Sequence, residues 1–133
     1  NSEPYDSRSA CLGYGTCSPV CPSRAQYSAD VHAQKAVENG ARIIDRAVVQ
    51  RLRHDDDGER IVDAVCETPD GGPYVQQADQ FVLAAGGVET PRMLLLSRSD
   101  QYPNGLANSS GTVGKYLRES PYIGVAGELG IPT

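Results

Sequence analysis

Long hydrophobic runs, an excess of positive charge and internal repeats are all missing from this 133-residue sequence. No apolar run approaches the roughly 18 residues that a membrane-spanning helix needs, so we expect no membrane span. Lysines and arginines number 12 against 17 aspartates and glutamates, and the net charge of -5 argues against a nucleic-acid partner. The first residues, Asn1 to Ser9, are polar, so the sequence shows no targeting segment and favours a soluble protein.

The composition is that of a globular domain with many turns. Hydrophobic residues make up 39% of the chain and charged residues 22%, while 14 glycines and 9 prolines interrupt the pattern. A chain of this length can build one domain with a core of its own.

The first half of the chain predicts a loop, a helix and a short strand. Glycines and prolines are frequent in residues 1–28 and little periodicity exists there, which indicates an ordered loop. Asp30 is a candidate N-cap for a helix that Asn39 and Gly40 would end. The apolar stretch Ala41–Ile44 follows at once and favours a strand in an α/β layer.

Three further stretches predict an antiparallel meander. Residues 47–53, 61–67 and 74–76 have the character of strands, and turn-forming residues separate them. The acidic run Asp55–Glu59 lies at the first of these turns, and we interpret it as a solvated hairpin turn.

The stretch Phe81–Ala85 is apolar throughout, which is typical of a parallel strand buried on both faces. Gly86 and Gly87 end it, and Thr90-Pro91 is the signature of a helix start, with Thr90 as N-cap and the helix running to about residue 97. Residues 98–112 predict a loop, and one more strand is expected near residues 122–125. We therefore predict a mixed α/β fold in which a strand, a pair of glycines and a helix N-terminus could face a phosphate group.

Three cysteines, Cys11, Cys17 and Cys21, lie within eleven residues of the N-terminal loop. Thiolates bind soft metals and iron–sulfur clusters, so these residues are candidate metal ligands. A local disulfide and buried free thiols are alternatives that the spacing leaves open. Cys66 lies in a predicted strand and is expected to be a small buried hydrophobic residue.

The segment Phe81–Ser97, with the helix, meander and loop that surround it, resembles the glucose–methanol–choline (GMC) oxidoreductases. The likeness runs in order from about Cys17 to Leu117. It implies an FAD-dependent enzyme that oxidises CH–OH groups of sugars or alcohols. It also implies three sections: a Cys-rich loop over residues 1–28, the central part of a Rossmann-like FAD-binding domain over 29–117, and the start of a substrate-side segment over 118–133.

The resemblance assigns binding roles rather than catalytic ones. Val48 or Val49 would contact the FAD adenine through backbone atoms, and Ala85, Gly86 and Gly87 would lie against the adenosine and pyrophosphate.

The cysteine-rich loop resembles one branch of the same family. In that branch of sugar and polyol dehydrogenases, a loop at this place holds a 3Fe–4S cluster that passes electrons from the flavin to an external carrier. Cys11, Cys17 and Cys21 would be its ligands here.

The sequence departs from the family in what it lacks. The Gly-x-Gly-x-x-Gly fingerprint does not occur, and neither of the two histidines has the setting of the family's catalytic base. Ser120 stands where the family often has a histidine. We therefore expect a fragment that needs the remainder of its polypeptide, does not turn over alone and retains neither FAD nor a cluster. The alternative is a free-standing iron–sulfur or electron-transfer module.

Overall fold

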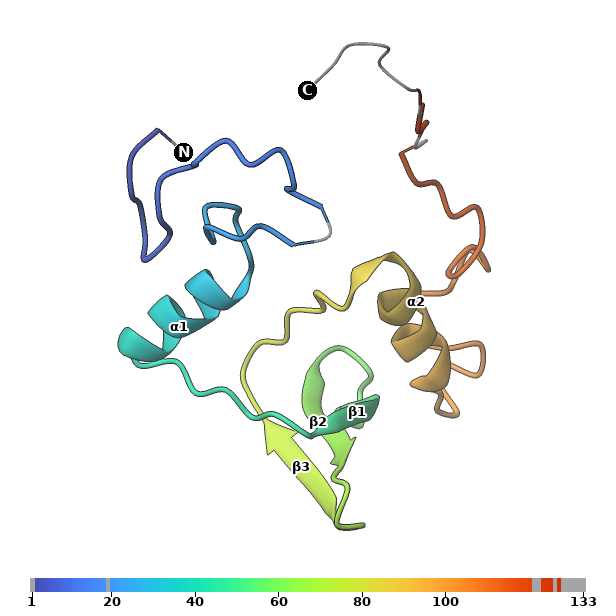
Figure 1. The fold of residues 1–133 in the computed structure, drawn as a ribbon. Coiled ribbons are helices and arrows are strands. Elements are labelled where there is room, and N and C mark those ends of the chain that lie inside the picture. Colours follow the sequence, from blue (N-terminus) through green and yellow to red (C-terminus); the bar gives the residue numbers. More distant parts are fainter. Residues whose placement is uncertain (1, 19, 121–122, 126, 128–133) are drawn as a thin grey trace. The chain divides into compact units, whose positions relative to one another are not determined.

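The computed structural model describes residues 2–18, 20–120, 123–125 and 127. The chain divides into two compact units, Asn1–Asp45 and Arg46–Thr133, and each is described by itself. The first unit contains helix α1 (Asp30–Glu38), and the second contains the strands and helix α2 (Gly86–Leu96), as Figure 1 shows. Among the described residues, no helix is long and apolar enough to cross a membrane.

Helix α1 lies where a helix was predicted, but its N-cap residue differs from the predicted one. Ala29 rather than Asp30 occupies the N-cap position, and no side chain caps that end. At the other end Gly40 adopts a φ of +92°, and its N–H donates to the carbonyl of Val37 at 2.9 Å. The N–H of Ala41 donates to Ala36, also at 2.9 Å, which completes a Schellman motif. The glycine stop was therefore predicted correctly.

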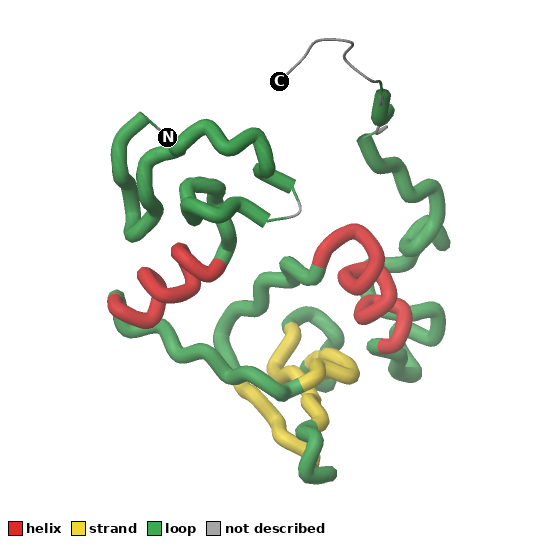
Figure 2. The backbone as a smooth tube through the Cα atoms, viewed as in Figure 1, coloured by secondary structure: helices red, strands yellow, loops and turns green. Residues whose placement is uncertain are grey.

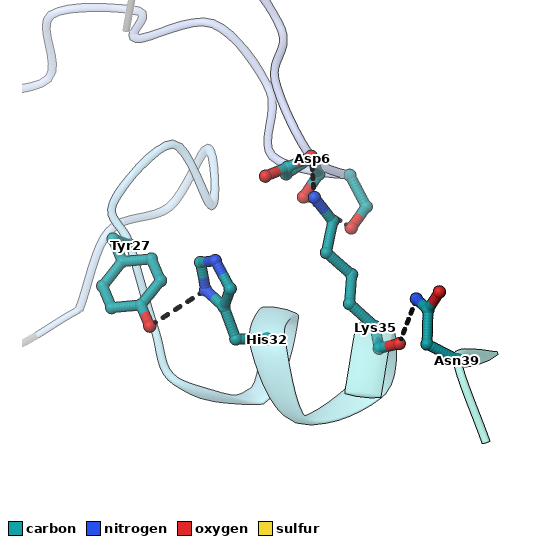
Figure 3. A network of polar contacts seen from close by, with 6 residues as sticks. Asp6, Tyr27, His32, Lys35 and Asn39 are labelled. Atoms are coloured by element: carbon teal, nitrogen blue, oxygen red, sulfur yellow. Dashed lines mark hydrogen bonds and ion pairs between the residues drawn. The ribbon is translucent and has the colours of Figure 1, made fainter. Parts of the chain in front are cut away.

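Polar contacts rather than a buried face hold α1 in its unit, because none of its residues is buried. Figure 3 shows Lys35 paired with the Asp6 carboxylate and His32 Nδ1 3.1 Å from the Tyr27 hydroxyl. The Asn39 side chain donates to the Lys35 carbonyl at 2.8 Å. His32 is exposed, and its ring is hydrogen-bonded to Tyr27 of the same unit.

The predicted strand over residues 41–44 is not formed. These residues have no strand assignment, and Ile43 and Ile44 are 57% and 41% exposed. A strand needs a neighbour to satisfy its N–H and C=O groups, and the one sheet among the described residues does not include this segment. The apolar character of residues 41–44 was therefore not enough to predict a strand.

The predicted meander is confirmed. Strands β1 (Val48–His54), β2 (Ile61–Glu67) and β3 (Pro73–Gln77) form an antiparallel sheet in the order β1-β2-β3, drawn in yellow in Figure 2. The acidic run forms the turn between β1 and β2, as expected. There the Asp55 carboxylate accepts the N–H groups of Glu59 and Arg60 at 2.9 and 3.2 Å.

The core of the second unit lies where the sheet meets α2 and the loop after it. Its buried members are Leu52, Ala64, Cys66 and Leu106. Cys66 is 5% exposed, which confirms its predicted place as a small buried residue. Helix α2 packs against β1 (Figure 1).

Ser97 and Gly105 fix α2 in place. Ser97 is 2% exposed, and its Oγ accepts the N–H of Leu52 at 2.9 Å while donating to the Met93 carbonyl at 2.7 Å. Gly105 has a φ of +93° and lies so close to α2 that a Cβ there would stand 2.6 Å from the carbonyl oxygen of Leu94. Only glycine fits this position.

The prediction of a buried parallel strand over residues 81–85 is wrong. The segment has no strand assignment, and burial alternates along it. Phe81 and Leu83 pack against the core, whereas Val82 is 89% exposed and Ala84 is also exposed. The segment covers the core with one face and is not paired within the sheet of the described residues, so the mixed α/β class is confirmed but its parallel part is not.

Two more differences concern the end of the chain and the start of α2. Helix α2 begins at Gly86, not at Thr90, and Pro91 lies inside it. Ile123–Val125 form no strand, while Tyr122, the first residue of that prediction, is outside the described residues.

Candidate functional site

The N-terminus of α2 is the part of the second unit best suited to meet a phosphate group. Ala85 is the N-cap and Gly86 is the first helical residue, with a φ of +85°. A left-handed conformation at this point costs an L side chain about 1–2 kcal/mol but costs glycine nothing comparable. Gly86 therefore lets the chain turn sharply from the extended segment into the helix.

The Thr90 side chain supports this turn instead of capping a later helix. Its Oγ1 accepts the N–H of Ala85 at 3.2 Å, from inside the first turns of α2. The prediction of Thr90 as N-cap was wrong because the glycines extend the helix by a turn toward the N-terminus. Pro91, which has no N–H, cannot bond back to the carbonyl of Gly87.

The first-turn N–H groups of α2 are available to a ligand. The first four N–H groups of a helix have no carbonyl partner inside it, and no side chain caps α2. Ala85, Gly86 and Gly87 are all exposed, and the side chains of Leu117 and Glu119 lie beside Gly87. A helix N-terminus in this state fits a phosphate or pyrophosphate group.

The electrostatics near this end are mixed. Glu89 lies in the first turn and pairs with Arg92 at 3.0 Å, both side chains being more than half exposed. Arg92 therefore forms a surface ion pair within α2. That pair is internally neutral, so the positive potential at this end comes from the helix dipole, and the Glu119 carboxylate beside Gly87 opposes it.

Val48 and Val49 occupy the first two positions of β1. Val48 is 61% exposed opposite Glu67, and Val49 is half-buried opposite Cys66. Val48 lines a shallow hollow beside the β2–β3 turn, whereas Gly87 lines a separate hollow along α2. The structure therefore does not gather the five predicted FAD contacts into one hollow, and their roles stay predictions.

The cysteine loop belongs to the first unit. All four cysteines of the chain are free thiols, with Cys11 and Cys17 exposed and Cys21 half-buried. Within the part of the chain that the structure describes, no three His, Cys, Asp or Glu side chains are gathered in a way that could hold a metal ion. The donor set has the softness that an iron–sulfur cluster prefers, but its sulfurs are not assembled here. The cluster stays a prediction.

The thiols differ in acidity for visible reasons. The pKa of Cys21 is lowered to about 7, first by a hydrogen bond from the Ser23 hydroxyl and next by the backbone N–H of Gln26. Burial raises the pKa of Cys66, because the thiolate loses its hydration. Cys66 is thus a packing residue and Cys21 the more acidic thiol.

His54 has a structural role. Its Nε2 is 2.7 Å from the Ser99 hydroxyl, Nδ1 contacts the Asp55 carbonyl, and the ring meets that of Tyr102 edge to face. These bonds tie β1 to the loop after α2, and the Tyr102 hydroxyl donates to the Gly58 carbonyl at 2.6 Å. His54 is therefore engaged in packing and hydrogen bonding within the second unit.

Sequence reasoning missed four residues. Ser97 and Gly105 hold α2, and a serine at a helix end or a glycine in a loop gives no hint of a distant partner. Arg8 and Arg24 line a cavity of the first unit. Both arginines lie in a loop, and the sequence around them does not indicate that they share a cavity.

Comparison with known proteins places these features in context. Residues 4–122 match the family described as GMC oxidoreductase. The fructose dehydrogenase large subunit of Gluconobacter japonicus is 42% identical over 126 residues, which cover 95% of this chain. The 2-methyl-1,2-propanediol dehydrogenase of Mycolicibacterium austroafricanum is 37% identical over 86 residues, or 65% of this chain. The 6'''-hydroxyparomomycin C oxidase of Streptomyces lividus is 28% identical over 128 residues.

The chain is short beside these relatives. It spans 23% of the fructose dehydrogenase large subunit, 15% of the 2-methyl-1,2-propanediol dehydrogenase and 22% of the 6'''-hydroxyparomomycin C oxidase.

Proposed function

The chain belongs to the GMC oxidoreductase family, and from this premise we propose that it supplies part of the FAD-binding surface of a dehydrogenase. The carrying observation is the glycine-started, uncapped N-terminus of α2, which fits a pyrophosphate group. The parent protein would oxidise a CH–OH group of a sugar or alcohol, with FAD accepting the hydride when bound. The names of the dehydrogenase relatives support this substrate class.

Each predicted contact has a role within this proposal. The N–H groups at Gly86 and Gly87 would bind pyrophosphate oxygens, and Ala85 would contact the adenosine. Val48 or Val49 would hold the adenine edge through backbone atoms at the start of β1. The remainder of the GMC polypeptide would supply the other half of the cofactor site, because this sequence has no Gly-x-Gly-x-x-Gly segment.

The cysteine loop would serve electron transfer in the parent protein. Cys11, Cys17 and Cys21 would ligate a 3Fe–4S cluster that hands electrons to an external carrier. This proposal is supported by the donor set and by the loop's resemblance to the cluster-bearing branch of the family. We further propose that the isolated chain retains neither FAD nor a cluster and has no turnover.

Titration with FAD tests the main proposal. Flavin fluorescence should show weak or no binding to the 133-residue chain, and tight binding to the full polypeptide that contains it. In that polypeptide, Gly86→Ala should weaken FAD binding because it strains the turn at a φ of +85°. Gly111→Ala is the matched control, since Gly111 has a similar φ of +68°, has nothing within 4 Å of its Cβ position and lines neither the hollow at Val48 nor the one at Gly87. Equal effects of the two substitutions on FAD binding would refute a specific role for the α2 N-terminus.

Two observations separate this proposal from a free-standing iron–sulfur module. Iron and sulfide analysis of anaerobically purified chain should find neither element in stoichiometric amount; a stoichiometric cluster without flavin would favour the module. The flanking gene sequence should encode a dinucleotide fingerprint upstream and a catalytic histidine downstream.

A further inference from the structure

The first unit has a half-open cavity of about 450 Å³ beside the first turn of α1, and most of its lining residues are exposed. This volume lies within the range of small-molecule sites, roughly 300–1,000 Å³. Polar groups dominate its lining, which includes Ser7, Arg8, Arg24, Gln26, Ser28 and Gln34. None of these residues is among the predicted FAD contacts.

Arg8 is held in place without a carboxylate partner. A tight turn pairs the backbone of Tyr5 with that of Arg8, through N–H to carbonyl bonds of 3.0 Å in both directions. The guanidinium carbon then lies 5.6 Å from the ring centres of both Tyr5 and Tyr27. Asp6, the nearest acid in sequence, is engaged by Lys35. Among the described residues Arg8 forms no ion pair, and its buried Nε has no hydrogen-bond partner.

Arg24 brings a second cation to the same cavity. Its backbone adopts a φ of +54°, and its N–H donates to the Cys21 carbonyl at 3.1 Å, which closes a turn. Two arginines on the lining of one cavity are suited to an oxyanion, because a guanidinium presents several donors in a plane. Cys21 also lines the cavity, but an oxyanion does not need its thiol for binding.

One acid opposes these cations. Asp30 lines the cavity, and its pKa is lowered first by a hydrogen bond from the Ser28 hydroxyl and also by the charge of Arg24. Asp30 is therefore ionised at neutral pH, and the three charged side chains together leave an excess of one positive charge. The first turn of α1 adds no free donors to this charge, because the N–H groups of Val31, His32 and Ala33 already donate to the carbonyls of Ser28 and Ala29.

We propose that this cavity binds the phosphate monoester of a small polyol or sugar. Arg8 and Arg24 would bind the phosphate oxygens, since both line the cavity and neither is paired with an acid by an ion pair among the described residues. The hydroxyl of Ser7 and the amides of Gln26 and Gln34 would bind sugar hydroxyls. The cavity is several times larger than one phosphate group, and most of its remaining lining can form hydrogen bonds, with Val20 and Val31 as apolar members. The proposal is independent of the FAD role, because it uses only residues of the first unit.

Titration of the 133-residue chain with glucose 6-phosphate, inorganic phosphate and glucose tests it. Amide NMR shifts, recorded at fixed pH and ionic strength, give the affinity and the residues affected. We expect glucose 6-phosphate to shift the amides of residues 5–8 and 24–34, inorganic phosphate to bind more weakly at the same amides, and glucose to have no effect.

Charge variants decide whether the arginines are responsible. Arg8→Met and Arg24→Met should each weaken glucose 6-phosphate binding by about tenfold, the loss expected for one charge-assisted hydrogen bond. Asp30→Asn should tighten it by about threefold because an opposing charge is removed. Arg42→Met is the matched control: it removes one exposed cation of the same unit that does not line the cavity, and it should leave the affinity unchanged.

Three results would overturn the proposal. Absence of shifts with glucose 6-phosphate would do so, as would equal shifts with glucose, since the phosphate would then not be recognised. A loss with Arg42→Met as large as that with Arg8→Met would show that only net charge matters. If Arg8→Met alters the spectrum of the unliganded chain, Arg24→Met supplies the same test with the tyrosine pair left in place.

Discussion

Replacing Ser97 by alanine removes one oxygen atom on which two parts of the second unit depend. The Ser97 Oγ accepts the N–H of Leu52, 45 residues away in β1, and it is the only side-chain acceptor recorded for that N–H among the described residues. Leu52 and Ser97 are 6% and 2% exposed, so water cannot easily replace the lost acceptor. An unsatisfied buried N–H costs about 1–3 kcal/mol, and Ser97→Ala should lower the free energy of unfolding by that amount.

Urea unfolding of the chain, with fluorescence of its tyrosines, measures the change. At an m value of roughly 1–3 kcal/mol per molar urea, the midpoint should fall by about 1 M. Hydrogen exchange should show the Leu52 amide losing protection beyond that of its neighbours in β1. Ser110→Ala is the matched control, because Ser110 is exposed and bonds only to Thr112 nearby, so its effect should stay within about 0.5 kcal/mol.

The reasoning is refuted if Ser97→Ala unfolds at the same urea concentration as the Ser110 control. The same conclusion holds if the Leu52 amide keeps its protection in the variant. Either result would mean that α2 is held to β1 by apolar contacts alone.

Three further changes test other parts of the second unit. Gly105→Ala should lower the free energy of unfolding by about 2 kcal/mol or more, because its Cβ would stand 2.6 Å from the Leu94 carbonyl oxygen. Gly71→Ala is the control in the same urea assay: Gly71 has a φ of +79° but nothing within 4 Å, so only backbone strain of about 1 kcal/mol is expected. Asp63→Asn should lower the free energy of unfolding by about 1–2 kcal/mol, because buried Asp63 accepts two 2.7 Å hydrogen bonds from the half-exposed Arg53. Glu89→Gln is the control: its pair with Arg92 is exposed, so the loss should be under about 0.5 kcal/mol. Burial holds the pKa of Cys66 above its ordinary 9.0, so on raising the pH the unfolded chain loses the thiol proton before the folded chain does. The free energy of unfolding should therefore fall as the pH rises past 9, and Cys66→Ala should reduce this fall. The same pH dependence in Cys66→Ala would contradict the raised pKa.

The elements that the sequence predicted correctly are those determined by local signals. The meander depends on turn residues between alternating stretches, and the end of α1 depends on Gly40, whose positive φ closes the Schellman motif. Cys66 was placed correctly because a small apolar residue in a central strand has little alternative to burial.

The elements that failed depend on partners rather than on local sequence. Residues 41–44 and 81–85 have the composition of strands, but a strand also needs a hydrogen-bonding neighbour, and the described sheet provides none for them. The start of α2 was misjudged because Thr90-Pro91 has the signature of a first turn. The glycines before it allow an earlier start, and the Thr90 hydroxyl is directed back to Ala85 instead.

The candidate sites divide in the same way. Gly86 was predicted to end the apolar stretch, and its φ of +85° at the start of α2 is a local property of glycine, whereas its contact with FAD stays a prediction. The assembly of three cysteines and the pairing of Arg8 with two tyrosine rings are properties of three-dimensional placement. The spacing of Arg8 from the two tyrosines along the chain does not predict that their side chains meet. Whether the three cysteines come together depends on more than the sequence of their loop.

The alternating burial over residues 81–85 has a practical consequence for anyone who purifies this chain. Val82 presents a branched apolar side chain to water on a segment whose backbone groups are not engaged by a neighbouring strand of the described sheet. Such an open ribbon is a template onto which a strand from another molecule can add. We therefore expect concentrated samples to associate through this segment, and we expect dilute handling at a pH well above the sequence pI of 4.9 to oppose this by mutual repulsion.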